Sequence, residues 1–116
     1  MWRALVICAV CLVGQAAWAH AFLDKASPPV GSEVSGSPPS LTLSYSEPVE
    51  PLFSTIQVTD ASGAPVSDGK PTPQDGGRVL VVKLKALPPG VYSVVWHVTS
   101  VDTHKTEGHF TFTVKP

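Results

Sequence analysis

Apolar and polar residues alternate along several short segments of this 116-residue chain, and clusters of Pro and Gly separate the segments. A period of two places successive side chains on opposite faces of an extended strand, so each segment predicts a strand with one buried face. No stretch shows a convincing helical period. The chain is therefore expected to be all-β, with candidate strands at 21–26, 41–46, 53–59, 78–85, 90–100 and 109–114.

The same alternation assigns the predicted core. His97 and His109 fall on the parity opposite the apolar residues and are predicted to lie at the surface. The segment 60–77 is too polar for the core and is expected to be a loop, with at most a short edge strand at 65–67. Four strands have an apolar face that is expected to be buried: Leu41, Leu43 and Tyr45; Leu80, Val82 and Leu84; Tyr92, Val94, Trp96 and Val98; and Phe110, Phe112 and Val114.

This number of short strands favours two antiparallel sheets packed face to face. The prediction is an immunoglobulin-like Greek-key β-sandwich, with a small closed β-barrel as the alternative. The chain shows no internal repeat and no linker long enough to separate two domains, so one domain is expected.

The first nineteen residues have the three parts of a secretory signal. Arg3 supplies the positive charge, the run 4–14 is apolar, and small residues lead to a cleavage site after Ala19. The apolar run is too short to span a bilayer as a helix. We therefore expect residues 1–19 to be removed and residues 20–116 to be exported as one periplasmic domain. Small residues a few positions to either side leave alternative cleavage sites open.

Both cysteines, Cys8 and Cys11, lie in this signal, so the exported domain is expected to have neither a disulfide nor a thiolate ligand. Neither cysteine follows a small residue, and no lipid anchor is expected. Eight Lys and Arg, one of them Arg3 in the signal, stand against nine Asp and Glu without a run of like charge. A nucleic-acid-binding surface requires clustered basic residues, so no nucleic acid is expected as a partner.

Two features far apart in the sequence carry potential metal ligands. A mature chain that begins at His20 offers its α-amine and its imidazole together, which can close a chelate ring on one metal ion. Asp102 and His104 lie two residues apart in a predicted extended connection, so their side chains are expected to point the same way. Two imidazoles, an amine and a carboxylate favour Cu(II), with zinc as the competitor. Each feature alone has a simpler interpretation. His20 can be the first residue merely by accident of where the signal is cut, and Asp102 can be a turn residue whose carboxylate caps the main chain.

An initial His is followed, in order, by SPPVGSE, YSEPV, PPGVYSVVW and SVDTHKTEGHFTFTV. Together these motifs resemble the CopC family of periplasmic copper-resistance proteins over essentially all of residues 20–116. The resemblance implies a Greek-key β-sandwich with one Cu(II) ion per chain, bound by the amine and imidazole of His20, the carboxylate of Asp102 and the imidazole of His104. It also brings Glu47 near this site, as an outer-sphere group or weak axial ligand, with a purely structural role as the alternative.

The resemblance further implies a binding protein rather than an enzyme, one that sequesters or carries copper and hands it to an inner-membrane importer of the CopD type. Some members also have a methionine-rich loop that forms a Cu(I) site. The corresponding segment here, 59–71, contains no Met, so no Cu(I) site is expected. Two alternative functions are a copper histidine-brace oxidase or monooxygenase and a metal-free adhesion-type sandwich. Asp102 argues against the oxidase, because it would occupy a position that oxygen chemistry needs open.

Overall fold

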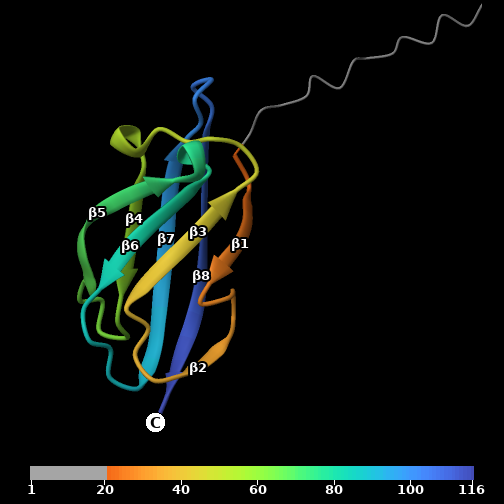
Figure 1. Cartoon of the computed structure of the whole chain (residues 1–116). Coiled ribbons are helices and arrows are strands. Elements are labelled where there is room, and N and C mark those ends of the chain that lie inside the picture. Colours follow the sequence, from red (N-terminus) through yellow and green to blue (C-terminus); the bar gives the residue numbers. More distant parts are fainter. Residues whose placement is uncertain (1–20) are drawn as a thin grey trace, which may run out of the picture.

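Residues 21–116 are described by a computed structural model, and they form two four-stranded sheets packed face to face (Figure 1). The strand orders are β1-β3-β6-β5 and β2-β8-β7-β4. The predicted β-sandwich is confirmed, and the sheets do not close into the small barrel considered as the alternative. The elements are β1 (Leu23–Ser27), β2 (Glu33–Ser35), β3 (Ser40–Tyr45), the 3-10 turn η1 (Pro51–Phe53), β4 (Thr55–Thr59), β5 (Ser67–Gln74), the 3-10 turn η2 (Asp75–Gly77), β6 (Val79–Leu84), β7 (Gly90–Thr99) and β8 (Lys105–Lys115).

The core lies between the two sheets and contains every side chain that the alternation assigned to it. Burying a side chain of this size stabilises the fold by about 1.5–3 kcal/mol relative to leaving it exposed. Trp96 contributes a tightly packed ring: it meets Tyr45 edge to face, with ring centroids 5.4 Å apart. A Cβ atom on Gly108 would lie only 2.5 Å from the Trp96 ring, so the absence of a side chain at Gly108 makes room for the indole.

β7 and β8 form the longest hairpin, paired from Gly90 and Val114 to Thr99 and Lys105. β8 therefore begins four residues before the predicted start at His109. The extra pairs carry the hairpin beyond the neighbouring strands, and its turn projects from one end of the sandwich (Figure 1). That end also holds the beginning of β1.

Two strands were not predicted. β5 pairs with β6 where a polar loop was expected, and its register shifts between Asp68 and Thr72. β2 has only three residues, and it pairs with β8 in parallel, whereas only antiparallel pairing was expected. Both are outermost strands, so neither contributes much to the apolar pattern. Within residues 21–116 no helix is long and apolar enough to cross a membrane.

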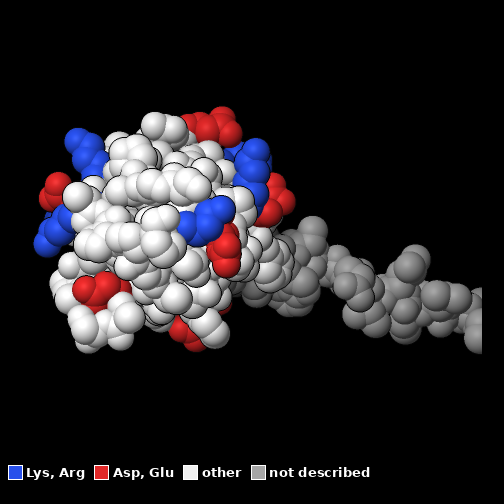
Figure 2. Space-filling view, turned by 90° about the horizontal axis from the view of Figure 1, so that it is seen from below, with Lys and Arg blue, Asp and Glu red and all other residues white. Residues whose placement is uncertain are grey.

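The charged side chains are dispersed over the end of the sandwich that lies opposite the β7–β8 turn. Figure 2 shows this end, with Lys and Arg separated by Asp, Glu and uncharged residues. On the described residues seen in that view there is no continuous basic patch.

Candidate metal centre

Three segments meet at the end of the sandwich where the β7–β8 turn lies. The Thr106 hydroxyl donates a hydrogen bond of 2.7 Å to the carbonyl oxygen of Ala21, which joins the start of the described chain to β8. The Ser46 amide donates to the carbonyl oxygen of Phe22 at 2.9 Å, and the Val101 amide donates to that of Pro48 at 3.2 Å. Residues 46–48 therefore lie between the first described residues and the hairpin turn.

The connection that carries Asp102 and His104 is a tight turn and not the extended segment that was predicted. Thr103 has a φ of 75°, a left-handed conformation that is uncommon for a residue with a side chain. The Ser100 amide donates to the carbonyl oxygen of His104 at 2.8 Å, and the Thr103 amide donates to that of Ser100 at 2.9 Å. The two predicted ligands therefore come together because the chain reverses its direction between them. The prediction had instead placed them on the same face of an extended segment.

Asp102 and His104 present their donor atoms to each other. Oδ2 of Asp102 lies 3.4 Å from Nδ1 of His104, and the two side chains are 39% and 45% exposed. Two donors that are each about 2.1 Å from one metal ion, at an angle of about 110°, are about 3.4 Å apart. A right-angled pair requires a separation of roughly 3.0 Å, so a small movement of exposed side chains adapts the pair to the tetragonal geometry of Cu(II).

The carboxylate of Asp102 is held in its charged form. The hydrogen bond from the Ser100 hydroxyl, assisted more weakly by the His104 ring, keeps the pKa of the Asp102 carboxyl below its ordinary value of 3.8. A metal ion at neutral pH therefore meets an ionised oxygen donor without first displacing a proton.

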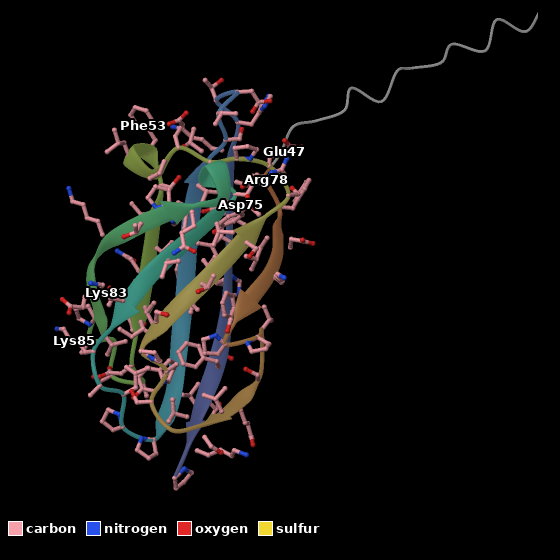
Figure 3. The ribbon with its side chains drawn as sticks, viewed as in Figure 1. Glu47, Phe53, Asp75, Arg78, Lys83 and Lys85 are labelled. Atoms are coloured by element: carbon pink, nitrogen blue, oxygen red, sulfur yellow. The ribbon has the colours of Figure 1, made fainter. Side chains whose placement is uncertain are left out.

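Glu47 lies in the middle segment of the three, and its side chain is half-buried. Its neighbours on both sides are fixed by main-chain bonds, Ser46 to Phe22 and Pro48 to Val101. Nη1 of Arg78 also donates to the carbonyl oxygen of Ser46 at 2.8 Å. Figure 3 shows Glu47 above Arg78, at the same end of the sandwich. This end therefore carries a second carboxylate near the β7–β8 turn, although no described contact joins Glu47 to Asp102 or His104.

His20, the fourth predicted site residue, lies outside the described residues, so its role stays a prediction. Within residues 21–116 no group of three or more His, Cys, Asp or Glu side chains is arranged to hold a metal ion. Asp102 and His104 alone supply two donors, which is fewer than the expected Cu(II) site requires.

The two remaining histidines lie at the surface, as predicted. Nε2 of His97 lies 2.8 Å from Oε2 of Glu107 on the outer face of β7 and β8, and the His97 side chain is 57% exposed. A pocket of about 490 Å³ includes both of these residues, whereas Asp102 and His104 are not part of its lining. His97 therefore belongs to a different surface from the Asp102–His104 pair.

The interpretation of the sequence missed two hydroxyl residues, Ser100 and Thr106. Ser100 is almost fully buried and bonds to both Asp102 and His104, and Thr106 bonds to Ala21. Ser100 stands two residues before Asp102, where a hydroxyl can reach a carboxylate within a turn. That spacing was available as a signal. Nothing in the local sequence links Thr106 to Ala21.

These observations define a class of protein: a small, mostly antiparallel β-sandwich with a carboxylate–imidazole pair on the turn of its longest hairpin. The chain belongs to the CopC family, since the CopC domain matches residues 23–115. It is 40% identical over 114 residues to Protein YobA of Escherichia coli K12, covering 97% of this chain and 92% of that protein.

Two solved structures of the family are similar to this fold. CopC from Methylosinus trichosporium OB3b has a TM-score of 0.74 and 36% identity, covering 84% of this chain and 95% of that one. PcoC from Escherichia coli, described as a methionine-rich copper resistance protein, has a TM-score of 0.74 and 33% identity, covering 83% and 99%. Proteins of the CopC family are copper-binding resistance proteins and not enzymes, so the alternative of a copper oxidase or monooxygenase is rejected.

Proposed function

We propose that this chain is exported by its signal, residues 1–19, and that residues 20–116 form a periplasmic protein that holds one Cu(II) ion per chain. Its ligands are the α-amine and imidazole of His20, the carboxylate of Asp102 and the imidazole of His104. The protein sequesters or carries copper and so contributes to copper resistance and homeostasis. The metal-free adhesion alternative has no specific observation in its favour.

The observation that carries this proposal is the fixed position of Ala21 beside the β7–β8 turn. Ala21 is fully buried, and its carbonyl oxygen accepts the hydrogen bond from Thr106, two residues beyond His104. Consecutive Cα atoms are about 3.8 Å apart, so a residue joined to Ala21 begins close to the turn. A mature chain that starts at His20 brings an amine and an imidazole to the end that already holds Asp102 and His104.

The donor set supports Cu(II) as the cargo. Three nitrogen donors and one carboxylate suit a tetragonal Cu(II) ion, whereas Cu(I) prefers soft thioether and thiolate sulfur. PcoC is described as methionine-rich. This chain has a single methionine, Met1, which leaves with the proposed signal, as do both cysteines. We therefore propose a Cu(II) protein without a methionine Cu(I) site.

Glu47 completes the proposal as an outer-sphere or weak axial group, supported by its place in the segment between Phe22 and Val101. We further propose that the copper is handed to an inner-membrane importer of the CopD type, as the family resemblance suggests. The exposed position of the Asp102 and His104 side chains supports direct transfer, because an acceptor can approach them without unfolding the domain.

The proposal is tested on protein recovered from the periplasm after expression of the full chain. N-terminal sequencing should give His20 as the first residue, with one tightly bound copper per chain. Electron paramagnetic resonance should show a tetragonal Cu(II) centre with a nitrogen-rich shell. Asp102→Ala and His104→Ala should each weaken Cu(II) binding in competition with a chelator, and one Gly inserted before His20 should do the same because it displaces the amine.

His97→Ala is the matched control, since it removes an exposed imidazole from the other surface. It should leave the affinity unchanged. A mature chain that begins after His20, or equal Cu(II) affinity in the Asp102→Ala, His104→Ala and His97→Ala variants, would remove the basis of the proposal.

A further inference from the structure

We propose that Ser100 is the positioning residue of the copper site, and that its hydroxyl holds the carboxylate of Asp102 and the main chain of His104 in the arrangement that binds the metal. This inference rests on the proposed function, because it assigns a role in the same site. It concerns a residue that does not itself contact the metal.

The hydroxyl of Ser100 is placed to act on both ligands at once. It donates a short hydrogen bond to Oδ1 of Asp102, which leaves Oδ2 facing Nδ1 of His104. The same oxygen accepts the amide proton of His104 at 3.2 Å. One hydroxyl therefore fixes which carboxylate oxygen faces the imidazole and how the His104 main chain leaves the turn.

The surroundings of Ser100 explain why these contacts are rigid. The residue is only 1% exposed, and its main chain forms a bridge with Val49 as well as the hydrogen bond to the carbonyl oxygen of His104. The two ligands are 39% and 45% exposed by comparison. A buried hydroxyl on a fixed main chain thus holds the side chain of Asp102 and the main chain of His104, as outer-shell groups in metal sites do for their ligands.

A merely structural serine is available for comparison at the same end of the fold. Ser54 is 6% exposed, donates from its hydroxyl to the carbonyl oxygen of Glu50 at 2.7 Å and accepts the Thr99 amide at 3.2 Å. Its bonds tie η1 to β7 and contact neither ligand. Ser54→Ala therefore matches Ser100→Ala in residue type and burial, and it likewise removes a hydroxyl that both donates and accepts.

The experiment measures Cu(II) affinity, by chelator competition, of periplasmic protein carrying Ser100→Ala or Ser54→Ala. Loss of an outer-shell partner typically weakens metal binding 10–100-fold, so about that loss is expected for Ser100→Ala. Ser54→Ala should change the affinity less than about threefold, whatever its effect on unfolding. In an Asp102→Ala background, adding Ser100→Ala should weaken binding clearly less than it does in the unsubstituted protein, because only the bond to the His104 amide is then left to lose.

Equal affinities for Ser100→Ala and Ser54→Ala, with tight binding by the unsubstituted protein, would overturn the role of Ser100 and leave the proposed function standing. An undiminished effect of Ser100→Ala in the Asp102→Ala background would also overturn it. Weak binding by the unsubstituted protein would overturn the proposed function, and this inference with it.

A measurement on the unsubstituted, metal-free protein covers the case in which Ser100→Ala does not fold. The hydroxyl proton of Ser100 should exchange slowly with water and show nuclear Overhauser contacts to the side chain of Asp102. A hydroxyl proton in rapid exchange would contradict the proposed role.

Discussion

The hydroxyl of Thr106 and the carbonyl oxygen of Ala21 form a hydrogen bond of 2.7 Å between residues 85 positions apart. It fastens the first described residue to the beginning of β8, beside the turn that carries Asp102 and His104. The position of Ala21 thus depends on a side chain that lies near the other end of the sequence. A small change in Thr106 can therefore act on the proposed site without touching any ligand.

Thr106→Val tests this dependence. The substitution keeps the branched shape and removes the donor to Ala21. We expect Cu(II) affinity to fall about tenfold, at the lower end of the range for outer-shell groups, because the proposed ligands of His20 are attached to Ala21, which loses this hydrogen bond. Chelator competition measures the change. Thr111→Val, on the exposed face of the same strand, should leave the affinity unchanged.

Tyr45→Phe should stabilise the fold. The Tyr45 hydroxyl is the one fully buried side-chain polar atom within residues 21–116 that has no hydrogen-bond partner, and burial raises the pKa of this phenol. Removing an unpaired polar group relieves its desolvation cost, so the free energy of unfolding should rise by about 1 kcal/mol. Denaturant unfolding measures the difference.

Tyr92→Phe is the matched comparison, since the Tyr92 hydroxyl donates to the carbonyl oxygen of Pro88. That substitution should lower the free energy of unfolding by about 1 kcal/mol. If both variants are destabilised equally, the Tyr45 hydroxyl has a partner in solution and the first expectation is wrong.

Gly108→Ala should destabilise the sandwich through the Trp96 ring. The added Cβ would lie 2.5 Å from Cζ2 and 2.7 Å from Cε2 of Trp96, and this ring has little space to move because it packs on Tyr45. Overpacking of this kind costs about 1–3 kcal/mol. The near-ultraviolet circular dichroism of Trp96 should change as well. Thr111→Ser, on the outer face of β8, should leave that spectrum unaltered.

Asp60 makes a pH-dependent contribution to stability. Its Oδ1 accepts hydrogen bonds from the hydroxyl and amide of Ser62 and from the amide of Ala64, and these donors lower the pKa of the Asp60 carboxyl below 3.8. A lowered folded-state pKa means that the stabilisation is complete above 3.8 and is lost as the pH falls through the folded value. Unfolding of the protein and of Asp60→Asn should therefore differ most above pH 3.8 and converge in stronger acid. A difference that stays constant with pH would contradict this assignment.

The sequence was sufficient to predict the core. When every second residue of a strand is large and apolar, as in Tyr92, Val94, Trp96 and Val98, only one of its two faces can be the buried one. β5 was missed for a physical reason. Ser67–Gln74 contains two prolines and a glycine, which disfavour a strand, but it lies at the edge of a sheet and becomes extended by pairing with β6. The early start of β8 was missed because Lys105–Gly108 are polar and take their conformation from pairing with β7.

At the candidate site, the sequence identified the two residues that the fold brings together but not the means by which it does so. Asp102 and His104 were chosen for their chemistry and their spacing, and both properties are local. The left-handed Thr103 and the bond from Thr106 to Ala21 depend on the closing of the hairpin and on contacts across the whole chain. The alternation of apolar and polar residues cannot predict the conformation of Thr103 or the hydrogen bond to Ala21.

The exposure of Asp102 and His104 on a projecting turn also determines how fast the proposed site would exchange copper. A copper ion held there would accept a ligand from an incoming molecule before its own ligands had all departed, so its transfer would proceed through a shared intermediate and not through free copper. The dissociation rate measured in dilution then says little about the rate of delivery. A site of this shape can retain its ion against water and still release it quickly to a competing chelator.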